Sequence, residues 1–225
     1  MSRPDALIVF LKEPRAGFVK TRLVPALGTA DALLLYRALA EEEVRRTEPQ
    51  AGDYTRLFFF APAEARAKME AWFPGEAWTA QVGDDLGARM SAAFEVAFRR
   101  GAGRTAIVGS DVPWVSRETV LEALRRLDDS DVVLGPSEDG GYYLMALSRP
   151  QPALFSGIPW STRTVLGATV ERAGTLGLSV QMLDVLPDID TIEDVRSAWG
   201  RLQGLVPEPL RSRVQSAAFG GRRPV

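Results

Sequence analysis

The sequence predicts a three-layer α/β/α fold in which a mostly parallel sheet carries helices on both faces. Short apolar runs typical of strands alternate with stretches of helical spacing along most of the chain. This rhythm is typical of parallel βαβ units, in which the helices cover the sheet. A length of 225 residues with 46% hydrophobic content can form one sizeable core.

In the first half of the chain, three strands are expected to alternate with three helices. Thr29 is a candidate N-cap of the first helix, and Pro74-Gly75 ends the second. The third helix is strongly amphipathic, with Asp85 placed to cap its start and Gly101 to close its end. The expected order is strand 6–11, helix 31–46, strand 56–61, helix 63–73, strand 78–82 and helix 86–100.

In the second half, further strands and helices continue the pattern. Ser116 precedes a stretch of helical spacing and is a candidate N-cap. The expected order is strand 105–108, helix 116–127, strands 131–134 and 142–147, helix 162–176, strand 179–183 and helix 192–202. Residues 1–204 are expected to form one domain, followed by a C-terminal helix or tail at 205–225.

The composition removes several kinds of chemistry. The chain has no cysteine and no histidine, which excludes a disulfide framework, a thiol nucleophile, Ser-His-Asp catalysis and histidine-ligated zinc. Carboxylates, lysines, arginines, hydroxyls and backbone amides remain. A catalytic metal is therefore expected to be a hard, oxygen-ligated ion, Mg²⁺ or Mn²⁺.

The charge balance and the apolar runs limit the partners and the location. A net charge of -2 argues against nucleic acid as the main partner, because duplex binding needs a basic face. No apolar run approaches the ~20 residues that span a bilayer, and the N-terminus lacks the pattern of a signal peptide. We therefore expect a cytoplasmic enzyme that acts on small molecules. The arginine-rich residues after Gly204 could pack on a second copy of the chain and form a homodimer.

Two of the three lysines, Lys12 and Lys20, lie in one loop directly after the first expected strand. Arg22 follows two residues later and would point the same way as Lys20 if the chain is extended. Gly17 permits the backbone to approach a ligand closely. Ammonium groups can bridge phosphate oxygens, and guanidinium groups grip them in a planar fork. The loop therefore favours a polyphosphate site, although the Walker A spacing is absent; the alternative is a solvated basic surface loop.

Two acidic segments follow later strands. Asp111 is expected at the carboxyl edge of a central strand, where it could bind Mg²⁺ or only close a local turn. Asp139 could accept a proton from an acceptor hydroxyl, and the adjacent Gly140, Gly141 and Tyr142 could line an acceptor or sugar pocket. The alternative at this second segment is a plain hairpin turn, because Asp-Gly is a standard hairpin signal.

Three further positions carry a weaker signal. Asp190, alone or paired with Asp188, could be a second metal ligand, or its charge could only complement the dipole of the helix that starts there. Arg89 could reach a phosphate from the start of its helix. Trp160 could form a lid over a substrate or belong to the core.

Six of these motifs occur in one order and resemble a known family of small bacterial transferases. The resemblance covers about residues 5–200. The family is described as glycosyltransferases associated with radical-SAM/selenoprotein gene clusters, within the nucleotide-diphospho-sugar transferase superfamily of GT-A-like fold. The motifs are Lys12-x-Pro14-x2-Gly17-x2-Lys20-Thr21-Arg22-Leu23, Gly83-x-Asp85-Leu86-Gly87-x-Arg89-Met90, Gly109-Ser110-Asp111-x-Pro113, Asp139-Gly140-Gly141-Tyr142-Tyr143-Leu144, Trp160-Ser161-Thr162 and Asp188-x-Asp190-Thr191-x-Glu193-Asp194.

The resemblance implies a role for each part of the expected site. The phosphates of a nucleotide would be bound by Lys12, Gly17, Lys20 and Arg22. Mg²⁺ or Mn²⁺ would be held by Asp111, with Asp190 as the second ligand. The acceptor or sugar pocket would be lined by residues 139–142.

Two functions within the enzyme class remain open at this point. The first is transfer of a sugar from a nucleotide sugar, the activity for which the family is named. The alternative is nucleotidyl transfer from a nucleoside triphosphate to a phosphorylated small molecule. Metal-dependent GT-A glycosyltransferases usually carry Asp-x-Asp where this chain has Gly109-Ser110-Asp111. The basic first loop is characteristic of nucleotidylyltransferases, which hold a triphosphate. A non-catalytic nucleotide-binding domain is a second alternative.

Overall fold

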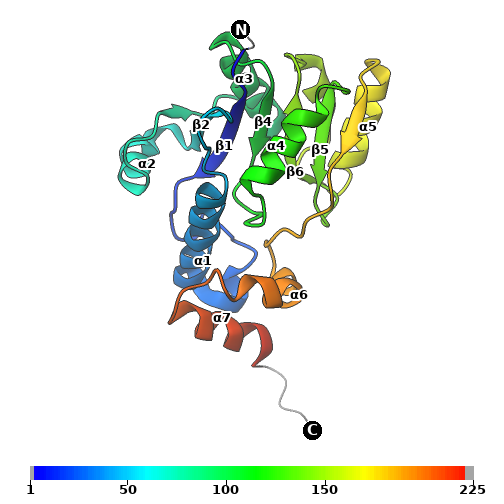
Figure 1. Cartoon of the computed structure of the whole chain (residues 1–225). Helices are drawn as coiled ribbons and strands as arrows, with labels where there is room; N and C mark the ends of the chain where they lie inside the picture. The colour runs from blue at the N-terminus through cyan, green and yellow to red at the C-terminus, as the bar shows by residue number, and fades with distance from the viewer. Residues whose placement is uncertain (1–2, 221–225) are drawn as a thin grey trace.

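The computed structural model describes residues 3–220 and confirms the α/β fold class, with helices on both faces of a seven-stranded sheet (Figure 1). The strand order is β3-β2-β1-β4-β6-β5-β7. The strands are β1 Ala6–Lys12, β2 Thr55–Ala61, β3 Trp78–Ala80, β4 Thr105–Val108, β5 Val132–Pro136, β6 Tyr142–Leu147 and β7 Val180–Met182.

All strand pairs are parallel except those of β6, which runs antiparallel to both β4 and β5. The chain adds β2 and β3 on one side of β1 and then returns to place β4 on the other side. The strand order therefore reverses between β1 and β4. In open α/β sheets this switch point, at the carboxyl ends of the strands, is where ligands bind.

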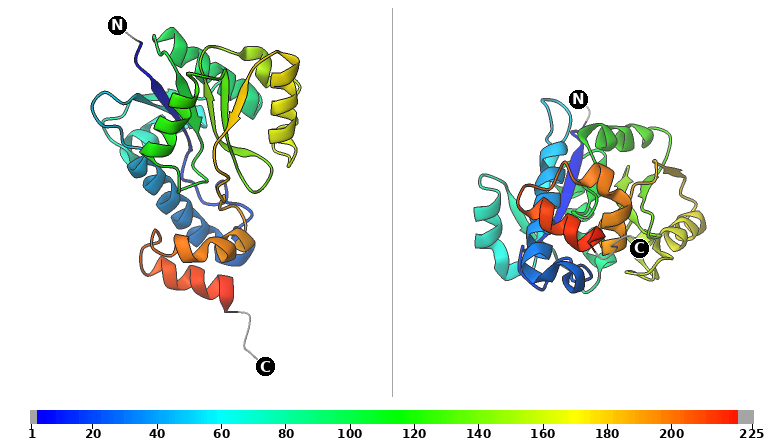
Figure 2. Two further views of the ribbon diagram at one scale, coloured as in Figure 1. Left: turned by 45° about the vertical axis from the view of Figure 1, so that its right-hand side comes forward. Right: turned by 90° about the horizontal axis from the view of Figure 1, so that it is seen from below.

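The helices are α1 Val24–Arg46, α2 Arg66–Trp72, α3 Leu86–Arg99, α4 Arg117–Arg126, α5 Val165–Thr175, α6 Ile192–Leu202 and α7 Leu210–Phe219, with 3₁₀ turns at Ala63–Ala65 and Pro152–Phe155. One hydrophobic cluster joins the sheet to α1, α2, α4, α6 and α7, and a second joins its other face to α3 and α5. Figure 2 shows α6 and α7 gathered with α1 at one end of the sheet.

The central strand β1 explains the two clusters. Leu7, Val9 and Leu11 belong to the first cluster, and Ala6, Ile8 and Phe10 to the second. Successive side chains of a strand point to opposite faces, so a continuously apolar strand can be buried on both sides. The continuous apolar run that predicted a buried strand therefore packs against both clusters.

Most expected elements are confirmed, and the differences lie mainly at their ends. Helix α1 begins at Val24 instead of residue 31, since Pro25 is compatible with a first helical turn. It is kinked at Gly28, where φ is +78°. The backbone of Gly28 is not helical, so α1 consists of two helical pieces that join at this kink, and Thr29 directly follows the junction. Its expected place as N-cap of the second piece stays a prediction. Asp85 and Ser116 do cap their helices through their side chains, as expected.

The C-terminal stretch forms α7, whose Val214 is fully buried in the same cluster as Leu7 of β1. Arg213 also pairs with Asp31 of α1 at 2.8 Å. At least part of this arginine-rich segment therefore has its partner inside the chain. Residues 221–225 of the expected tail lie outside the described residues. Within residues 3–220, no helix combines the length and the apolar character that a bilayer crossing needs.

Candidate active site

A cavity of about 790 Å³ opens at the switch point between β1 and β4. Residues from distant parts of the chain line it, among them the loop after β1, helix α1, the turn after β4, the β5–β6 turn and the segments before α5 and α6. Most of the site residues expected from the sequence are brought together here. Those in the lining are Lys12, Lys20, Arg22, Asp111, Asp139, Gly141, Tyr142, Trp160 and Asp190.

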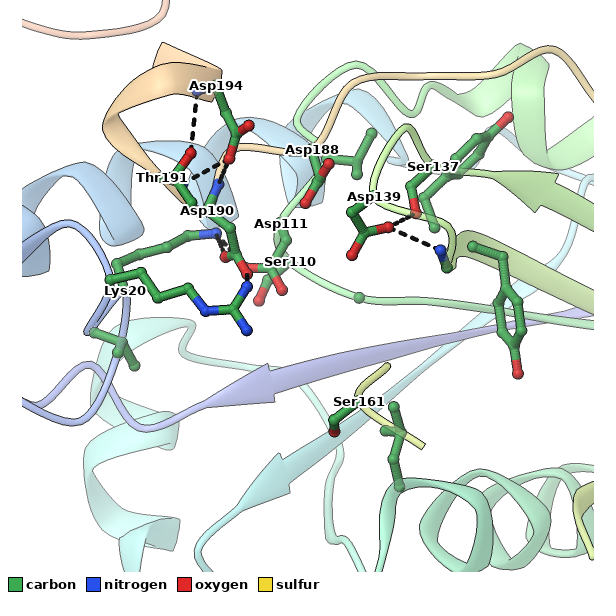
Figure 3. A pocket seen from close by; sticks show the side chains of 18 of the residues that line it. Lys20, Ser110, Asp111, Ser137, Asp139, Ser161, Asp188, Asp190, Thr191 and Asp194 are labelled. Carbon is green, nitrogen blue, oxygen red and sulfur yellow. Dashed lines mark hydrogen bonds and ion pairs between the residues drawn. The ribbon is translucent and has the colours of Figure 1, made fainter. Parts of the chain in front are cut away.

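The centre of the cavity is a three-residue ion cluster. The Nζ atom of Lys20 lies 2.5 Å from Oδ1 of Asp111 and 3.0 Å from Oδ1 of Asp190. The Lys20 side chain is only 2% exposed, whereas those of Asp111 and Asp190 are 52% and 36% exposed. Figure 3 shows the three side chains pointing toward one another. The two carboxylates face the cavity, and the ammonium is buried against them.

The pKa values of this cluster follow from its geometry. Burial by itself lowers the pKa of Lys20, but the two neighbouring carboxylates outweigh burial and raise it above its ordinary value. Burial raises the pKa of Asp111, yet the adjacent Lys20 ammonium lowers it overall. Lys20 and Asp111 therefore keep their charges at neutral pH.

The backbone brings Asp190 to Asp111 across a long stretch of sequence. The Ile189 N–H donates to the carbonyl oxygen of Asp111 at 3.1 Å, and the Trp114 indole N–H donates to the carbonyl oxygen of Pro187 at 2.7 Å. These bonds pin residues 187–189 to the turn after β4. An Asp-x-Asp motif would place two acids close together in the sequence. Here the fold brings the second acid, Asp190, next to Asp111.

At the start of α6, residues other than Asp190 cap the helix. Thr191 is the N-cap, and its hydroxyl accepts from the Asp194 N–H at 3.2 Å. In return, Asp194 Oδ2 accepts from the backbone N–H groups of Asp190 and Thr191 at 3.0 and 2.6 Å. Because Thr191 and Asp194 cap the helix, the Asp190 carboxylate is available to the cavity.

The basic loop reaches the cavity by tight turns and not as an extended segment. Lys20 has φ of +47°, in the left-handed region, and Gly17 has φ of +78°. Lys20 and Arg22 nevertheless converge on Asp190, with Arg22 Nη1 3.8 Å from its Oδ2. Gly17 lines neither of the two described cavities, and its positive φ serves the turn of the loop.

The β5–β6 segment is both a turn and a cavity wall. Oδ1 of Asp139 accepts from the Ser137 hydroxyl at 2.6 Å and from the Gly141 N–H at 2.8 Å, so one of its two oxygens holds the turn. Gly140 has φ of +90°, and a Cβ there would lie 2.1 Å from the carbonyl oxygen of Arg163. Gly140 therefore permits a close backbone approach and is not part of the cavity lining.

The packing of Tyr142 and Trp160 shows how each of these aromatic residues contributes to the cavity. Tyr142 lines the cavity with its ring, but its hydroxyl is buried without a hydrogen-bond partner among the described residues. Trp160 also lines the cavity while its indole rests on Gly87, where a Cβ would lie 2.3 Å from the ring. Trp160 is thus a wall of the cavity that is fixed by the core.

Arg89 does not face the main cavity. Its Nε donates to the carbonyl oxygen of Gly83 at 3.0 Å, and this bond holds the loop before α3 against the first turn of that helix. It lines a smaller neighbouring cavity of about 420 Å³ instead. Lys12 and Asp111 line both cavities, so the two spaces meet at the end of β1. The predicted phosphate contact of Arg89 would have to be made in this second space.

Two residues of α1 line the cavity and were missed by the sequence analysis. The Tyr36 hydroxyl accepts from the Lys12 N–H at 2.9 Å, donates to the Lys12 carbonyl at 3.0 Å and accepts from Ser110 Oγ at 3.4 Å, which joins the ends of β1 and β4. Glu43 is 2% exposed, and neither carboxylate oxygen has a partner within residues 3–220. Burial and the nearby Asp111 raise the pKa of Glu43 well above its ordinary value. Tyr36 and Glu43 lie seven positions apart on an otherwise apolar helix face, and this pattern could have indicated their place in a site.

Asp188 lies beside the central cluster in the same cavity (Figure 3). Burial, together with the negative charges of Asp139, Asp194 and Asp190, raises the pKa of Asp188 to about 6. The cavity therefore combines a cationic side, made by the basic loop, with a group of carboxylates.

The donor atoms of this cavity fit a hard divalent ion whose coordination is completed by a ligand. Asp111 and Asp190 present carboxylate oxygens within reach of a single ammonium nitrogen. In the described part of the chain, no group of three or more His, Cys, Asp or Glu residues is arranged to hold a metal. Mg²⁺ is commonly held by one or two carboxylates plus substrate phosphates, and Mn²⁺ suits the same oxygen donors.

The fold is that of a nucleotide-diphospho-sugar transferase-like protein. The chain belongs to the DUF2064 family, described as uncharacterized proteins conserved in bacteria, whose model matches residues 44–162. It is 31% identical to a proposed nucleotide-diphospho-sugar transferase from Desulfovibrio desulfuricans G20, whose crystal structure matches with a TM-score of 0.87 over 98% of both chains.

Two more distant relatives add to this picture. A phosphoenolpyruvate guanylyltransferase from Chloroflexus aggregans is 27% identical over 190 residues, which cover 81% of this chain and 91% of the relative. The 4-diphosphocytidyl-2C-methyl-D-erythritol synthase of Anaerococcus prevotii is 10% identical with a TM-score of 0.57, over 89% of this chain and 99% of that one. The second likeness concerns the fold alone.

Proposed function

We propose that this chain is a nucleotidyltransferase, which moves a nucleoside monophosphate from a nucleoside triphosphate to a phosphorylated small molecule. The observation that carries the proposal is the convergence of Lys20, Asp111 and Asp190 in a cavity that Lys12 and Arg22 also line. This set suits a polyphosphate with its hard cation. The relative named phosphoenolpyruvate guanylyltransferase supports nucleotidyl transfer over sugar transfer.

The proposed step needs no general base. A phosphate oxygen of the acceptor attacks the α-phosphorus, a new P–O bond forms, and pyrophosphate leaves with the electron pair of the bond that breaks. An ionised phosphate oxygen carries no proton that must be removed. Nucleotidyl transfer therefore suits a chain that has no histidine and whose Asp139 uses one oxygen to hold a turn.

The residues of the cavity would act by position and charge. Lys12, Lys20 and Arg22 are the cations that would neutralise the leaving pyrophosphate. Asp111 and Asp190 would hold Mg²⁺ or Mn²⁺, which when bound supplies further charge neutralisation between the phosphates. Arg163 also lines the cavity and is a cation available to an acidic acceptor.

Sugar transfer from a nucleotide sugar was the first expectation from the sequence, and the comparisons favour its alternative, nucleotidyl transfer. The proposed nucleotide-diphospho-sugar transferase of Desulfovibrio desulfuricans keeps sugar transfer as the second candidate. The two functions differ in the product that leaves, which is pyrophosphate in one and a nucleoside diphosphate in the other. A non-catalytic nucleotide-binding domain would release neither.

The test is product analysis with the purified chain. Each nucleoside triphosphate is incubated with Mg²⁺ and a panel of phosphorylated acceptors, beginning with GTP and phosphoenolpyruvate. Pyrophosphate release and a new diphosphate signal in ³¹P NMR are expected, and both should be lost in Asp111→Asn. Release of a nucleoside diphosphate from a nucleotide sugar, with no pyrophosphate from any triphosphate, would contradict the proposal.

A further inference from the structure

Lys20 occupies the position at which Asp111 and Asp190 would share a cation. Its Nζ lies 2.5 Å from one carboxylate oxygen and 3.0 Å from the other. The two oxygens are thus no further apart than the sum of these distances. The Lys20 side chain is 2% exposed although it belongs to the cavity lining, so the two carboxylates cover most of the ammonium.

Within the group formed by Lys20, Arg22, Asp111 and Asp190, the two positive and two negative charges balance. The two carboxylates face one buried ammonium and the exposed guanidinium of Arg22, which lies 3.8 Å from the second oxygen of Asp190. A divalent ion added beside the ammonium would give the cluster a net positive charge. Repulsion between cations a few ångströms apart is strong where solvent is excluded.

The same contact makes Lys20 unavailable to phosphate. An ammonium has three donors, and two of them are used by Asp111 and Asp190 in a buried place. Lys20 can contact a polyphosphate only after it has left at least one carboxylate. The loss of that ion pair is offset when a polyphosphate and a divalent ion arrive together, because each carboxylate and the ammonium then gain a new partner.

We propose that Lys20 is an exchangeable internal counter-ion, which keeps divalent metal off Asp111 and Asp190 until a polyphosphate draws the ammonium away. The free protein then binds metal weakly, and metal and polyphosphate bind with positive coupling. This inference depends on the polyphosphate site of the proposed function, but it does not depend on which group is transferred. It concerns binding alone and can be tested without turnover.

The experiment measures Mn²⁺ binding to the protein in the absence of nucleotide, by EPR of free Mn²⁺ and by isothermal titration calorimetry. Lys20→Met removes the internal cation and keeps much of the side-chain length. We expect its affinity for Mn²⁺ to exceed that of the wild type by at least about tenfold. Lys68→Met is the matched control, since Lys68 pairs with Glu13 and lines neither of the two cavities. Its affinity should change by less than about threefold.

A second measurement on the wild type keeps the test independent of how the variant folds. Mn²⁺ affinity is measured with and without inorganic tripolyphosphate, which lacks a base and cannot donate a nucleotide. We expect tripolyphosphate to raise Mn²⁺ affinity at least about tenfold, and this coupling to shrink in Lys20→Met when circular dichroism shows that the variant is folded. Reciprocity requires Mn²⁺ to raise tripolyphosphate affinity by the same factor.

Two outcomes would overturn the inference. One is an Mn²⁺ affinity in Lys20→Met that equals or falls below that of the wild type, which would make Lys20 a clamp that assembles the carboxylates for metal. The other is tight Mn²⁺ binding by the wild type that tripolyphosphate does not change. Either result leaves nucleotidyl transfer open, because the product analysis decides that separately. Conversely, the expected Mn²⁺ results would stand even if the triphosphate panel gave no product.

Discussion

The backbone N–H of Ile189 donates a hydrogen bond of 3.1 Å to the carbonyl oxygen of Asp111. This bond joins the segment before α6 to the turn after β4. As a result, the Asp190 side chain lies beside that of Asp111, and both carboxylates contact Lys20.

Replacing Asp111 by Asn should remove the proposed transfer while the protein stays folded. The side chain keeps its size, but it loses the charge that pairs with Lys20 and would hold the metal. A loss of at least about 100-fold in the rate of pyrophosphate release is expected, the usual scale for one electrostatic group of an active site. The rate is measured with saturating substrates, and circular dichroism checks the fold. A rate within about threefold of the wild type would exclude Asp111 from the reaction.

Replacing Lys20 by Ala should weaken nucleotide binding in the presence of Mg²⁺. The expected loss is about 1–3 kcal/mol, the scale of a hydrogen bond between charged groups. Calorimetric titration with a non-hydrolysable triphosphate measures it. Lys68→Ala is the control, because Lys68 pairs with Glu13 and is not among the residues that line the cavity. Equal affinities for the two variants would make Lys20 a residue of the protein framework only.

Replacing Tyr36 by Phe should loosen the ends of β1 and β4. The change leaves the backbone N–H and C=O of Lys12 without their tyrosine partner, which costs about 1–3 kcal/mol when the groups stay buried. Urea unfolding measures the loss of stability. Tyr54→Phe is the matched control, since its hydroxyl donates to the Thr47 carbonyl at 2.8 Å away from the cavity. Both variants should lose stability, but only Tyr36→Phe should also weaken triphosphate binding.

Glu43 should make the stability of the protein depend on pH. Its folded-state pKa is well above the ordinary value of 4.5, so the unfolded chain loses this proton at a lower pH than the folded protein does. Below the ordinary value the group opposes folding little. As pH rises from there toward the folded pKa, its contribution falls by up to about 1.4 kcal/mol per pH unit.

Glu43→Gln removes this titration and keeps the shape of the side chain. The free energy of unfolding of the wild type, minus that of Glu43→Gln, should therefore become more negative as pH rises above 4.5. Urea unfolding of both proteins at a series of pH values measures the difference. A difference that does not vary with pH would mean that Glu43 titrates normally in the folded protein.

Two glycines in helices should respond in opposite ways to alanine. In α3, a Cβ on Gly87 would lie 2.3 Å from the Trp160 indole, so Gly87→Ala should cost about 1–3 kcal/mol of stability and displace the cavity wall. In α5, a Cβ on Gly167 meets no atom within 4 Å, so Gly167→Ala should stabilise by about 0.5–1 kcal/mol. Thermal unfolding and tryptophan fluorescence check both, and a fluorescence change in Gly167→Ala but not in Gly87→Ala would contradict this packing.

Local patterns in the sequence determined most of the elements and several residues of the candidate site. Strand 142–147 and helix 192–202 were predicted at their observed bounds, because apolar runs and helix caps act over a few residues. The same patterns placed Lys20 in a loop after β1 and Asp111 after β4, and parallel strands bring such positions to one edge of the sheet.

Only the tertiary structure decided which of these residues meet. The antiparallel direction of β6 and the contact of Lys20 with both Asp111 and Asp190 depend on segments that are far apart in the chain. The same is true of the buried carboxylate of Glu43, which has no hydrogen-bond partner among residues 3–220. Hydrophobic packing between layers and a few backbone bonds such as Ile189 to Asp111 bring them together. Contacts of this kind leave no periodic trace in sequence, because burial constrains the type of a residue but not its partner.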